Sequence, residues 1–339
     1  MMTTKDAAEG RFYLEPCSQE EAAHHFHSWS ISEHWNPGSG GHDIRQVFHN
    51  IDPKGFFLGR IAAESDCKGK DDKVISIISA VRFGDSKLGW IGYYLVDPAY
   101  RGHGYGILGF HRALGHLQDC TSIGLDGVMA QVENYKKSGF TTINWQNERR
   151  HGSAADVIET KEPALVQAIR ENKIPGLVDI SDAPVDGLAV LEEQFTGLQR
   201  PDFVRNWALF HGSGRDDPLL GRFGAAVVSI DDPNTVLGYG CVRRAETSYR
   251  VGPLYGVSGE VAKQILVKLA MAVVDADRQS PHGVPLMFDI DMPNTNLEAV
   301  NIMDGFGWKN TFPSLRMWRG PGPKVDVNGV YGICTLEIG

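Results

Sequence analysis

The sequence is poor in cysteine and has no long hydrophobic run. Its 339 residues contain five cysteines, an odd number scattered along the chain without a C-x-x-C pair. This usage argues against a disulfide framework, and we expect the reduced thiols of a cytoplasmic protein. No apolar stretch is long enough to span a bilayer, and the opening MMTTKDAAEG lacks the apolar core of a secretion signal. We therefore expect no membrane partner.

The chain also lacks an excess of positive charge. Lysine and arginine number 33 against 42 aspartates and glutamates, so the formal net charge is −9 and the pI is near 5.7. This balance argues against a general nucleic-acid binder and mildly favours cationic amine substrates. Hydrophobic residues make up 42% of the chain, which is ordinary for a globular protein, and the length suggests two domains or one large one.

The most informative segment lies between Trp90 and Gln118. An apolar strand, Trp90–Val96, precedes an Asp-Pro break, the turn RGHGYG at residues 101–106 and a helix-period run, Ile107–Leu117. A strand, a glycine loop and a helix N-terminus together form an anion site, because backbone N–H groups and the helix dipole favour negative charge. The glycine spacing differs from the G-x-G-x-x-G of dinucleotide-binding loops. A tight turn with a purely structural role is the other reading of this segment.

A second motif follows the turn, in the order Tyr135-Lys136-Lys137-Ser138-Gly139-Phe140. The combination of a strand, D-P-x-Y-R-G-x-G-x-G, a helix and Y-x-K-x-G-F closely resembles the GNAT superfamily of acetyl-CoA-dependent N-acetyltransferases. The resemblance is clear for about residues 75–145 and looser elsewhere. It implies an α/β fold with a mixed (α+β) sheet and an acyltransferase activity of the EC 2.3.1 type, with acetyl-CoA as cosubstrate and no metal.

The second half repeats this order of strands and helices and resembles the degenerate second domain of tandem GNAT acetyltransferases. The segments that carry the resemblance are Gly252-Pro253-Leu254-Tyr255, Gly305-Phe306 and the ending from Tyr331 to Gly339. At the position of the pyrophosphate loop the sequence reads LYGVSG, with no Arg or Gln before paired glycines. We therefore expect two GNAT domains in tandem, residues 1–160 and 161–339, with CoA bound by the first alone. The boundary is expected within residues 150–175.

Periodicity and capping signals predict several further elements. Ser18 and Glu21 form a capping box that opens a helix reaching about Trp29. Ser258 is expected to cap a long amphipathic helix that ends at Asp277. Strands are predicted over residues 140–147, 315–319 and 330–338, and the polar residues after position 146 are interpreted as the approach to the domain boundary.

The resemblance also implies roles for the first motif. Backbone N–H groups of Leu95 and Val96 would line a slot where the fourth strand splays from the fifth at a bulge, and one would polarise the thioester carbonyl. The pyrophosphate would lie on the turn, which comprises Arg101, Gly102, His103, Gly104, Tyr105 and Gly106. Other roles are open: Leu95 and Val96 are also strand core, Arg101 could pair with a carboxylate, and His103 could simply be exposed.

The resemblance also makes Tyr135 the candidate general acid, because in relatives the tyrosine of this motif points into the slot and protonates the departing thiolate. A phenol pKa near 10 roughly matches that of an alkyl thiol, which suits this role. The alternative is a core tyrosine that supports the CoA tail. Relatives often carry an asparagine where this chain has Val128, and Gln131 or Asn134 could substitute for it. The general base is not evident, since Trp90–Val96 contains no carboxylate. A water chain could reach one of three acidic residues, Glu133, Glu33 or Asp289.

The first helix and the loop after it roof the acceptor site in the family fold. Trp29, His34 and Trp35 are therefore candidate acceptor-binding residues, with packing as the alternative. The nearby histidines His24, His25 and His27 lack the spacing of a tetrahedral metal site, and we expect no metal. Arg243, Arg244 and Arg250 could bind a substrate carboxylate, but a solvated or ion-paired role is the stronger expectation.

Three functions follow from these observations. The first is an acetyl-CoA-dependent N-acetyltransferase that acts on the primary amine of a small molecule, as a monomer or homodimer, with a second domain that shapes the acceptor pocket. The second is a protein or peptide N-acetyltransferase, which an open groove beside Tyr135 would favour. The third is a non-catalytic acyl-CoA-binding regulatory module, supported by the missing base on the fourth strand.

Overall fold

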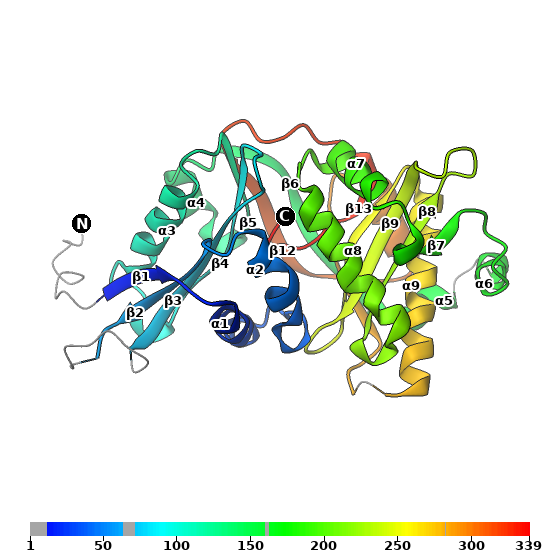
Figure 1. The fold of residues 1–339 in the computed structure, drawn as a ribbon, viewed down its shortest axis with the longest axis horizontal. Coiled ribbons are helices and arrows are strands. Elements are labelled where there is room, and N and C mark those ends of the chain that lie inside the picture. The colour runs from blue at the N-terminus through cyan, green and yellow to red at the C-terminus, as the bar shows by residue number, and fades with distance from the viewer. Residues whose placement is uncertain (1–11, 64–71, 160–162, 282) are drawn as a thin grey trace.

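The computed structural model describes residues 12–63, 72–159, 163–281 and 283–339, which form a long sheet with helices on both sides (Figure 1). The expected division between residues 160 and 161 falls in a gap between described ranges and stays a prediction. Cys67 also lies outside the described residues, and the other four cysteines are free thiols. None of the helices in the described ranges combines the length and the apolar character that a bilayer crossing needs.

The first half, residues 12–159, begins with an antiparallel meander and continues with strands that alternate with helices. Its strands are β1 (Phe12–Pro16), β2 (Phe56–Ile61), β3 (Lys73–Arg82), β4 (Leu88–Val96), β5 (Ser122–Val128) and β6 (Thr142–Ser153). Its helices are α1 (Gln19–Ser32), α2 (His49–Ile51), α3 (Tyr105–His116), α4 (Val132–Lys137) and α5 (Ala154–Ile158). The predicted strand, glycine turn and helix after residue 90 are confirmed as β4, the turn and α3.

The second half, residues 163–339, follows the same order. Its strands are β7 (Leu177–Asp179), β8 (Arg222–Val228), β9 (Val236–Arg244), β10 (Tyr249–Gly256), β11 (Met287–Pro293), β12 (Lys309–Arg319) and β13 (Val330–Gly332). Its helices are α6 (Pro163–Arg170), α7 (Val185–Thr196), α8 (Pro201–Asp216), α9 (Gly259–Gln279) and α10 (Leu297–Gly305). Both predicted helix starts are confirmed: Ser18 and Glu21 form a capping box at α1, and the Ser258 hydroxyl accepts a hydrogen bond from the Val261 N–H at α9.

An exchange of strands joins the two halves. The strand order is β1-β2-β3-β4-β5-β12-β6-β11-β10-β9-β8-β7, with β13 paired to β10. Thus β12 of the second half lies between β5 and β6, and residues 147–153 of β6 pair with β11 of the second half. Each half completes the sheet of the other, so hydrogen bonds run unbroken from β1 to β7.

Three predicted strand boundaries were wrong, and the exchange explains them. The strand expected over residues 315–319 begins at Lys309, because its first residues pair with β6. The strand expected over residues 140–147 continues to Ser153, because its polar residues pair across to the second half: Arg149 with Asp291 and Arg150 with Asp304. The strand expected over residues 330–338 ends at Gly332. There the chain leaves β10, and the Ile333 N–H donates to the Asp291 carbonyl at 2.8 Å. The remaining residues cross toward the first half.

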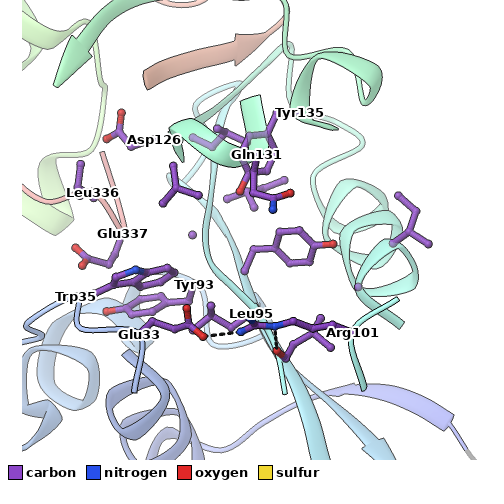
Figure 2. Close-up of a pocket in the computed structure, with 18 of the residues that line it drawn as sticks. Glu33, Trp35, Tyr93, Leu95, Arg101, Asp126, Gln131, Tyr135, Leu336 and Glu337 are labelled. Atoms are coloured by element: carbon purple, nitrogen blue, oxygen red, sulfur yellow. Dashed lines mark hydrogen bonds and ion pairs between the residues drawn. The ribbon is translucent and has the colours of Figure 1, made fainter. Parts of the chain in front are cut away.

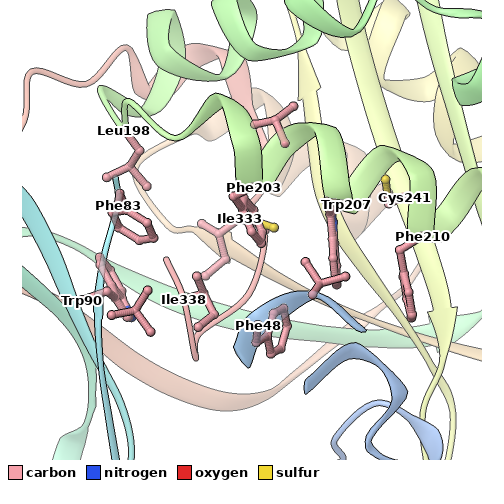
Figure 3. Packing of buried hydrophobic residues seen from close by; sticks show 14 of the residues in the cluster. Phe48, Phe83, Trp90, Leu198, Phe203, Trp207, Phe210, Cys241, Ile333 and Ile338 are labelled. Carbon is pink, nitrogen blue, oxygen red and sulfur yellow. The ribbon is translucent and has the colours of Figure 1, made fainter. Parts of the chain in front are cut away.

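A shared hydrophobic core lies where the halves meet (Figure 3). Trp207 of α8 stacks on Phe48 of the first half with ring centroids 5.4 Å apart. Ile338, at the end of the chain, is fully buried in the same cluster as Trp90 of β4. Burying a side chain of this size stabilises the fold by roughly 1.5–3 kcal/mol, so this cluster holds the halves in one arrangement.

Candidate active site

A slot opens between β4 and β5, the two parallel strands of the first half. They pair through Leu88, Gly89 and Trp90 alone among their described residues and then diverge. The divergence begins at a bulge in β4, where the register with β3 shifts and Tyr93 takes a left-handed backbone conformation, with φ of 51°. Beyond the bulge, Leu95 and Val96 remain paired with β3 and face β5 without a strand partner there. Their positions match the predicted slot.

The glycine turn lies at the mouth of this slot, directly before α3. Gly104 occupies the N-cap position of α3 with φ of 86°, and no described atom lies within 4 Å of where a Cβ would stand. Gly106 is needed for a different reason, because a Cβ there would come within 2.6 Å of the Tyr94 hydroxyl. The space beside Gly102 and Gly104, next to the first N–H groups of α3, is therefore open, as an anion site requires.

The charged and aromatic residues of the turn point in different directions. Arg101 donates from Nε to the Val96 carbonyl at 2.9 Å and from Nη2 to Glu33 at 2.5 Å, so its guanidinium bridges the slot mouth to the end of α1. His103 is exposed, and Tyr105 packs on Phe12 with centroids 4.8 Å apart. Neither side chain lines the slot, so in this arrangement the turn offers backbone rather than side-chain donors.

One continuous cavity of about 480 Å³ joins the slot to a chamber between the two halves (Figure 2). It is lined by the turn, by both diverging strands, by the loop after α1 and by the second half's β12 and chain end. The lining residues include Glu33, Trp35, Tyr93, Tyr94, Leu95, Val96, Arg101, Gly102, Gly104, Gly106, Asp126, Val128, Gln131, Tyr135, Arg149, Phe312, Leu336 and Glu337. The glycine turn and a chamber built by both halves therefore belong to the same cavity.

Tyr135 reaches this cavity from α4. Its ring crosses β5 at Gly127, where a Cβ would come within 2.7 Å of the ring. Burial raises the pKa of Tyr135 above its usual value, with a smaller contribution from Tyr94. No described residue makes a hydrogen bond to its hydroxyl. The side chain is therefore protonated at neutral pH and free to donate to a bound molecule. Of its two predicted neighbours, Gln131 lines the cavity, and Asn134 donates to Gln131 at 2.8 Å.

The three candidate acceptor residues lie in different places. Trp35 lines the cavity, and its carbonyl accepts a 3.3 Å hydrogen bond from Arg149 of β6. Trp29 packs against the shared core, and His34 is exposed with φ of 58°. Neither Trp29 nor His34 is among the residues that line the cavity. The loop after α1, rather than the helix itself, thus forms this part of the wall.

Ion pairs hold the chamber walls. Asp126 of β5 pairs with Arg316 of β12 through two hydrogen bonds of 2.9 and 2.6 Å. Burial nevertheless raises the pKa of Asp126, against the opposing charge of Arg316. Glu337 accepts from Arg250 at 2.9 Å. Burial is the largest single effect and opposes its ionisation, but Arg250, the Thr335 hydroxyl and Arg243 together outweigh it and lower the pKa of Glu337 to about 2.

Two of the three candidate arginines, Arg243 and Arg250, are ion-paired, in agreement with the stronger expectation. Arg250 also binds Asp291 at 2.9 Å, and Arg243 binds Asp43 of the first half at 2.9 Å. Of the three candidate bases, Glu33 lines the cavity, Glu133 is exposed beside Lys136, and Asp289 accepts from Ser248 and contacts His151. Within the described ranges no group of three or more His, Cys, Asp or Glu side chains could hold a metal ion.

Several wall residues could not be found from sequence motifs. Phe312, Leu336 and Glu337 come from the second half and reach the cavity through the exchanged strand β12 and the chain end. Tyr93 belongs to β4 and Asp126 to β5. The sequence predicts these two strands, but the alternation of side chains does not show which face of each strand lines the cavity. Gly92 is a sequence feature of β4 that relates to this wall. A Cβ at this position would come within 2.3 Å of the Glu337 carbonyl, so the glycine makes room for the chain end.

The chain itself fills the corresponding slot of the second half. β10 and β11 pair in parallel through residues 249–251 and 288–290 and then separate, but β13 occupies the gap and pairs with Leu254 and Tyr255. Glu298 of α10 accepts hydrogen bonds from the Gly259 N–H, at the first residue of α9, and from the Tyr331 hydroxyl. A carboxylate of the protein thus occupies the helix N-terminus where the first half has open space.

Comparison with known proteins finds a GNAT match in each half of the chain. Residues 14–140 match the model of the acetyltransferase (GNAT) family, and residues 188–332 match that of an acetyltransferase (GNAT) domain. The chain is 30% identical over 311 residues to holothin acyltransferase of Pseudoalteromonas sp. (strain SANK 73390), covering 92% of this chain and 89% of that protein. It is 23% identical over 267 residues to an uncharacterised N-acetyltransferase of Bacillus subtilis, YitH, covering 78% and 81%.

Solved structures share the whole architecture at low sequence identity. A proposed acetyltransferase from Pyrococcus horikoshii superposes with a TM-score of 0.68 at 19% identity, covering 97% of this chain and 96% of that one. A tandem GNAT protein from the clavulanic acid biosynthesis pathway superposes with a TM-score of 0.57 at 12% identity, covering 92% and 99%. Together with the 30% identical relative, these matches show that the chain belongs to the GNAT acetyltransferase family and carries two GNAT domains in tandem.

Proposed function

We propose that this GNAT protein is an acetyl-CoA-dependent N-acetyltransferase that acts on the primary amine of a small molecule. The observation that carries the proposal is the single cavity that joins the glycine turn and Tyr135 to a chamber walled by both halves. A site for transfer between two bound molecules needs two connected compartments, and this cavity has them.

The residues of the slot fit acetyl-CoA. The open space at Gly102 and Gly104 accommodates a pyrophosphate on the N-terminus of α3. When bound, acetyl-CoA supplies an acetyl group activated as a thioester. The backbone N–H groups beyond the β4 bulge, at Leu95 and Val96, would polarise the carbonyl, an effect worth about 2.7–4 kcal/mol at other oxyanion sites. Tyr135 would protonate the departing sulfur.

The acceptor side of the cavity, which both halves wall, favours a small molecule over a protein or peptide. Phe312, Leu336 and Glu337 wall the chamber opposite the turn. A peptide acetyltransferase needs a groove through which a chain can pass. The relative named holothin acyltransferase makes holothin the first acceptor to test. We further propose that the protein acts in the cytoplasm as a monomer or homodimer, because its described thiols are free and its net charge disfavours nucleic-acid partners.

The test is release of CoA thiol from acetyl-CoA with holothin and a panel of small primary amines, run beside lysine-containing peptides. We expect thiol release that depends on a small amine and is matched by the acetylated product. Turnover of peptides alone would favour the protein acetyltransferase. Tight acetyl-CoA binding without turnover of any amine would favour the non-catalytic module.

A further inference from the structure

The charge balance of the chamber indicates which amines it admits. Three carboxylates line the cavity, Glu33, Asp126 and Glu337, and each is bound by an arginine at 2.9 Å or less. Two arginines also line the cavity. Arg101 is the partner of Glu33, and Arg149 is bound by Asp291 through two hydrogen bonds of 2.9 Å. The charged groups of the wall therefore cancel in pairs.

Asp126 has little capacity left to accept a proton or bind a cation. Its Oδ1 accepts from Arg316 Nε and from Asn147 Nδ2, both at 2.9 Å, and its Oδ2 accepts from Arg316 Nη2 at 2.6 Å. The side chain is fully buried. Binding a proton there would disrupt a bidentate pair and leave Arg316 as an uncompensated buried charge, which is strongly unfavourable.

Both carboxylate oxygens of Glu337 are also engaged in hydrogen bonds. It accepts from Arg250 through Oε1 and from the Thr335 hydroxyl through Oε2. Glu33 is the most exposed of the three carboxylates, and its contact with Arg101 is at the slot mouth rather than deep in the chamber. The remaining titratable residues of the lining are Tyr93, Tyr94, Tyr100 and Tyr135, and no histidine is among them. The chamber walls thus offer an ammonium group neither a free counter-ion nor an evident base.

We propose that the acceptor is bound and acetylated as a neutral, weakly basic arylamine, whose amino group is attached directly to a flat ring. Trp35, Tyr93 and Phe312 give the chamber aromatic walls that suit such a ring. An alkylammonium ion would lose its hydration in this chamber without gaining a partner, and that desolvation is costly. This inference rests on the proposed function, because it concerns the acceptor of the same reaction.

With a neutral amine, the protons lost and gained in the reaction balance without an additional base. The amine nitrogen forms a bond to the thioester carbonyl carbon, and the carbon–sulfur bond breaks with its electron pair on sulfur. The nitrogen loses one proton and the thiolate gains one. Tyr135 can carry out both transfers by giving its hydroxyl proton to sulfur and receiving the proton from nitrogen. An ammonium ion would have a second proton to lose, for which the described lining holds no unpaired acceptor.

The test uses the full-length protein and matched acceptors that share one ring, an arylamine and the benzylamine with one added methylene. Thiol release is followed from pH 6 to pH 10.5, which extends beyond the solution pKa of benzylamine, with the uncatalysed hydrolysis of acetyl-CoA subtracted. We expect the arylamine to be preferred at pH 7, with a flat kcat/KM over this range. Benzylamine kcat/KM should rise about tenfold per pH unit up to its own solution pKa, because the neutral fraction rises in that proportion.

Two variants, Glu33→Gln and Asp126→Asn, show whether an enzyme group acts as base. The inference predicts that neither variant moves the pH at which the benzylamine profile levels off. Preference for benzylamine at pH 7, or a profile that levels off well below the pKa of benzylamine and shifts in either variant, would overturn the inference and leave the proposed function intact. Absence of thiol release with any amine, holothin included, would overturn both.

Discussion

The two slots of this protein share one strand geometry and differ in what occupies them. In both halves, a pair of parallel strands diverges after three residues and a helix begins beside the gap. In the first half the helix N-terminus faces open space at Gly104. In the second half it faces Glu298, and the strand gap holds β13. The comparison teaches that orphan N–H groups and unpaired strand edges must be satisfied, either by a ligand or by the protein itself.

The end of the chain connects the two slots. After filling the second slot, the chain leaves β13 at Gly332 and brings Leu336 and Glu337 into the wall of the first cavity. Arg200, directly before α8, donates hydrogen bonds to the Ile338 and Gly339 carbonyls at 2.8 and 2.9 Å and fixes this segment. The domain without an open slot therefore still shapes the chamber of the other.

The largest effect is expected at the open helix N-terminus. Gly104→Glu places a side chain and a negative charge where the pyrophosphate must lie, so CoA binding should fall below detection in calorimetry. Gly305→Glu is the matched control, because Gly305 also has no described neighbour within 4 Å of a Cβ position but lies at the end of α10. Gly104→Ala separates the backbone strain at positive φ from the added charge. Full CoA affinity in Gly104→Glu would show that the pyrophosphate lies elsewhere.

The next effect compares the tyrosines of the two slots. Tyr135→Phe should lower kcat by roughly ten- to a thousandfold and leave CoA affinity within a few-fold, because a positioned general acid is typically worth about 10²–10⁴ in rate. Tyr331→Phe removes the hydroxyl that donates to Glu298, so it should lower stability by about 1 kcal/mol and leave kcat unchanged. Steady-state kinetics and thermal unfolding measure both. Equal rate losses in the two variants would contradict the division of roles.

The third effect concerns Glu337 in the connecting segment. Its pKa is about 2 in the folded protein against 4.5 normally, so its ionised form stabilises the fold above pH 4.5, and this contribution is lost as pH falls toward 2. The difference in unfolding free energy between wild type and Glu337→Gln should therefore shrink by on the order of 3 kcal/mol between pH 5 and pH 2. Urea unfolding at several pH values measures it. A difference that does not change with pH would mean that Arg250 does not hold the carboxylate ionised.

The smallest effect is expected at the filled helix N-terminus. Glu298→Ala leaves the Gly259 N–H and the Tyr331 hydroxyl without their acceptor, so we expect a loss of about 1–3 kcal/mol in unfolding free energy with kcat and CoA stoichiometry unchanged. Glu260→Ala on the same helix end is the control, since Glu260 makes exposed contacts with Lys263 and Gln264 and should cost about 0.5 kcal/mol or less. A second CoA site in Glu298→Ala would contradict the prediction that β13 still fills this slot when Glu298 is removed.

Sequence predicted the parts of the site that are local in the chain. β4, the turn and α3 follow one another within about thirty residues, and glycines with a required conformation mark the turn. The chamber wall could not be predicted, because Trp35 lies about 280 residues before Phe312 and about 300 residues before Glu337, and they meet through an exchanged strand and the chain end.

The exchange itself escaped prediction for a physical reason. The polar run that continues β6 resembles a linker in the sequence. Its arginines form ion pairs with residues of the other half, such as Asp291, and these partners are far away along the chain. Similarly, the second slot was expected to be degenerate from its missing loop motif, but nothing local in the sequence indicates that β13 and Glu298 fill it. Both the strand exchange and the filled second slot depend on contacts between residues that are far apart in the sequence.

Calorimetric titration of the wild-type protein with CoA tests the central contrast most directly. An open first slot and a self-filled second slot predict one binding site per chain, with none left in Gly104→Glu and one retained in Glu298→Ala. Two equivalent sites in the wild-type chain, or one site that survives Gly104→Glu unchanged, would contradict the account.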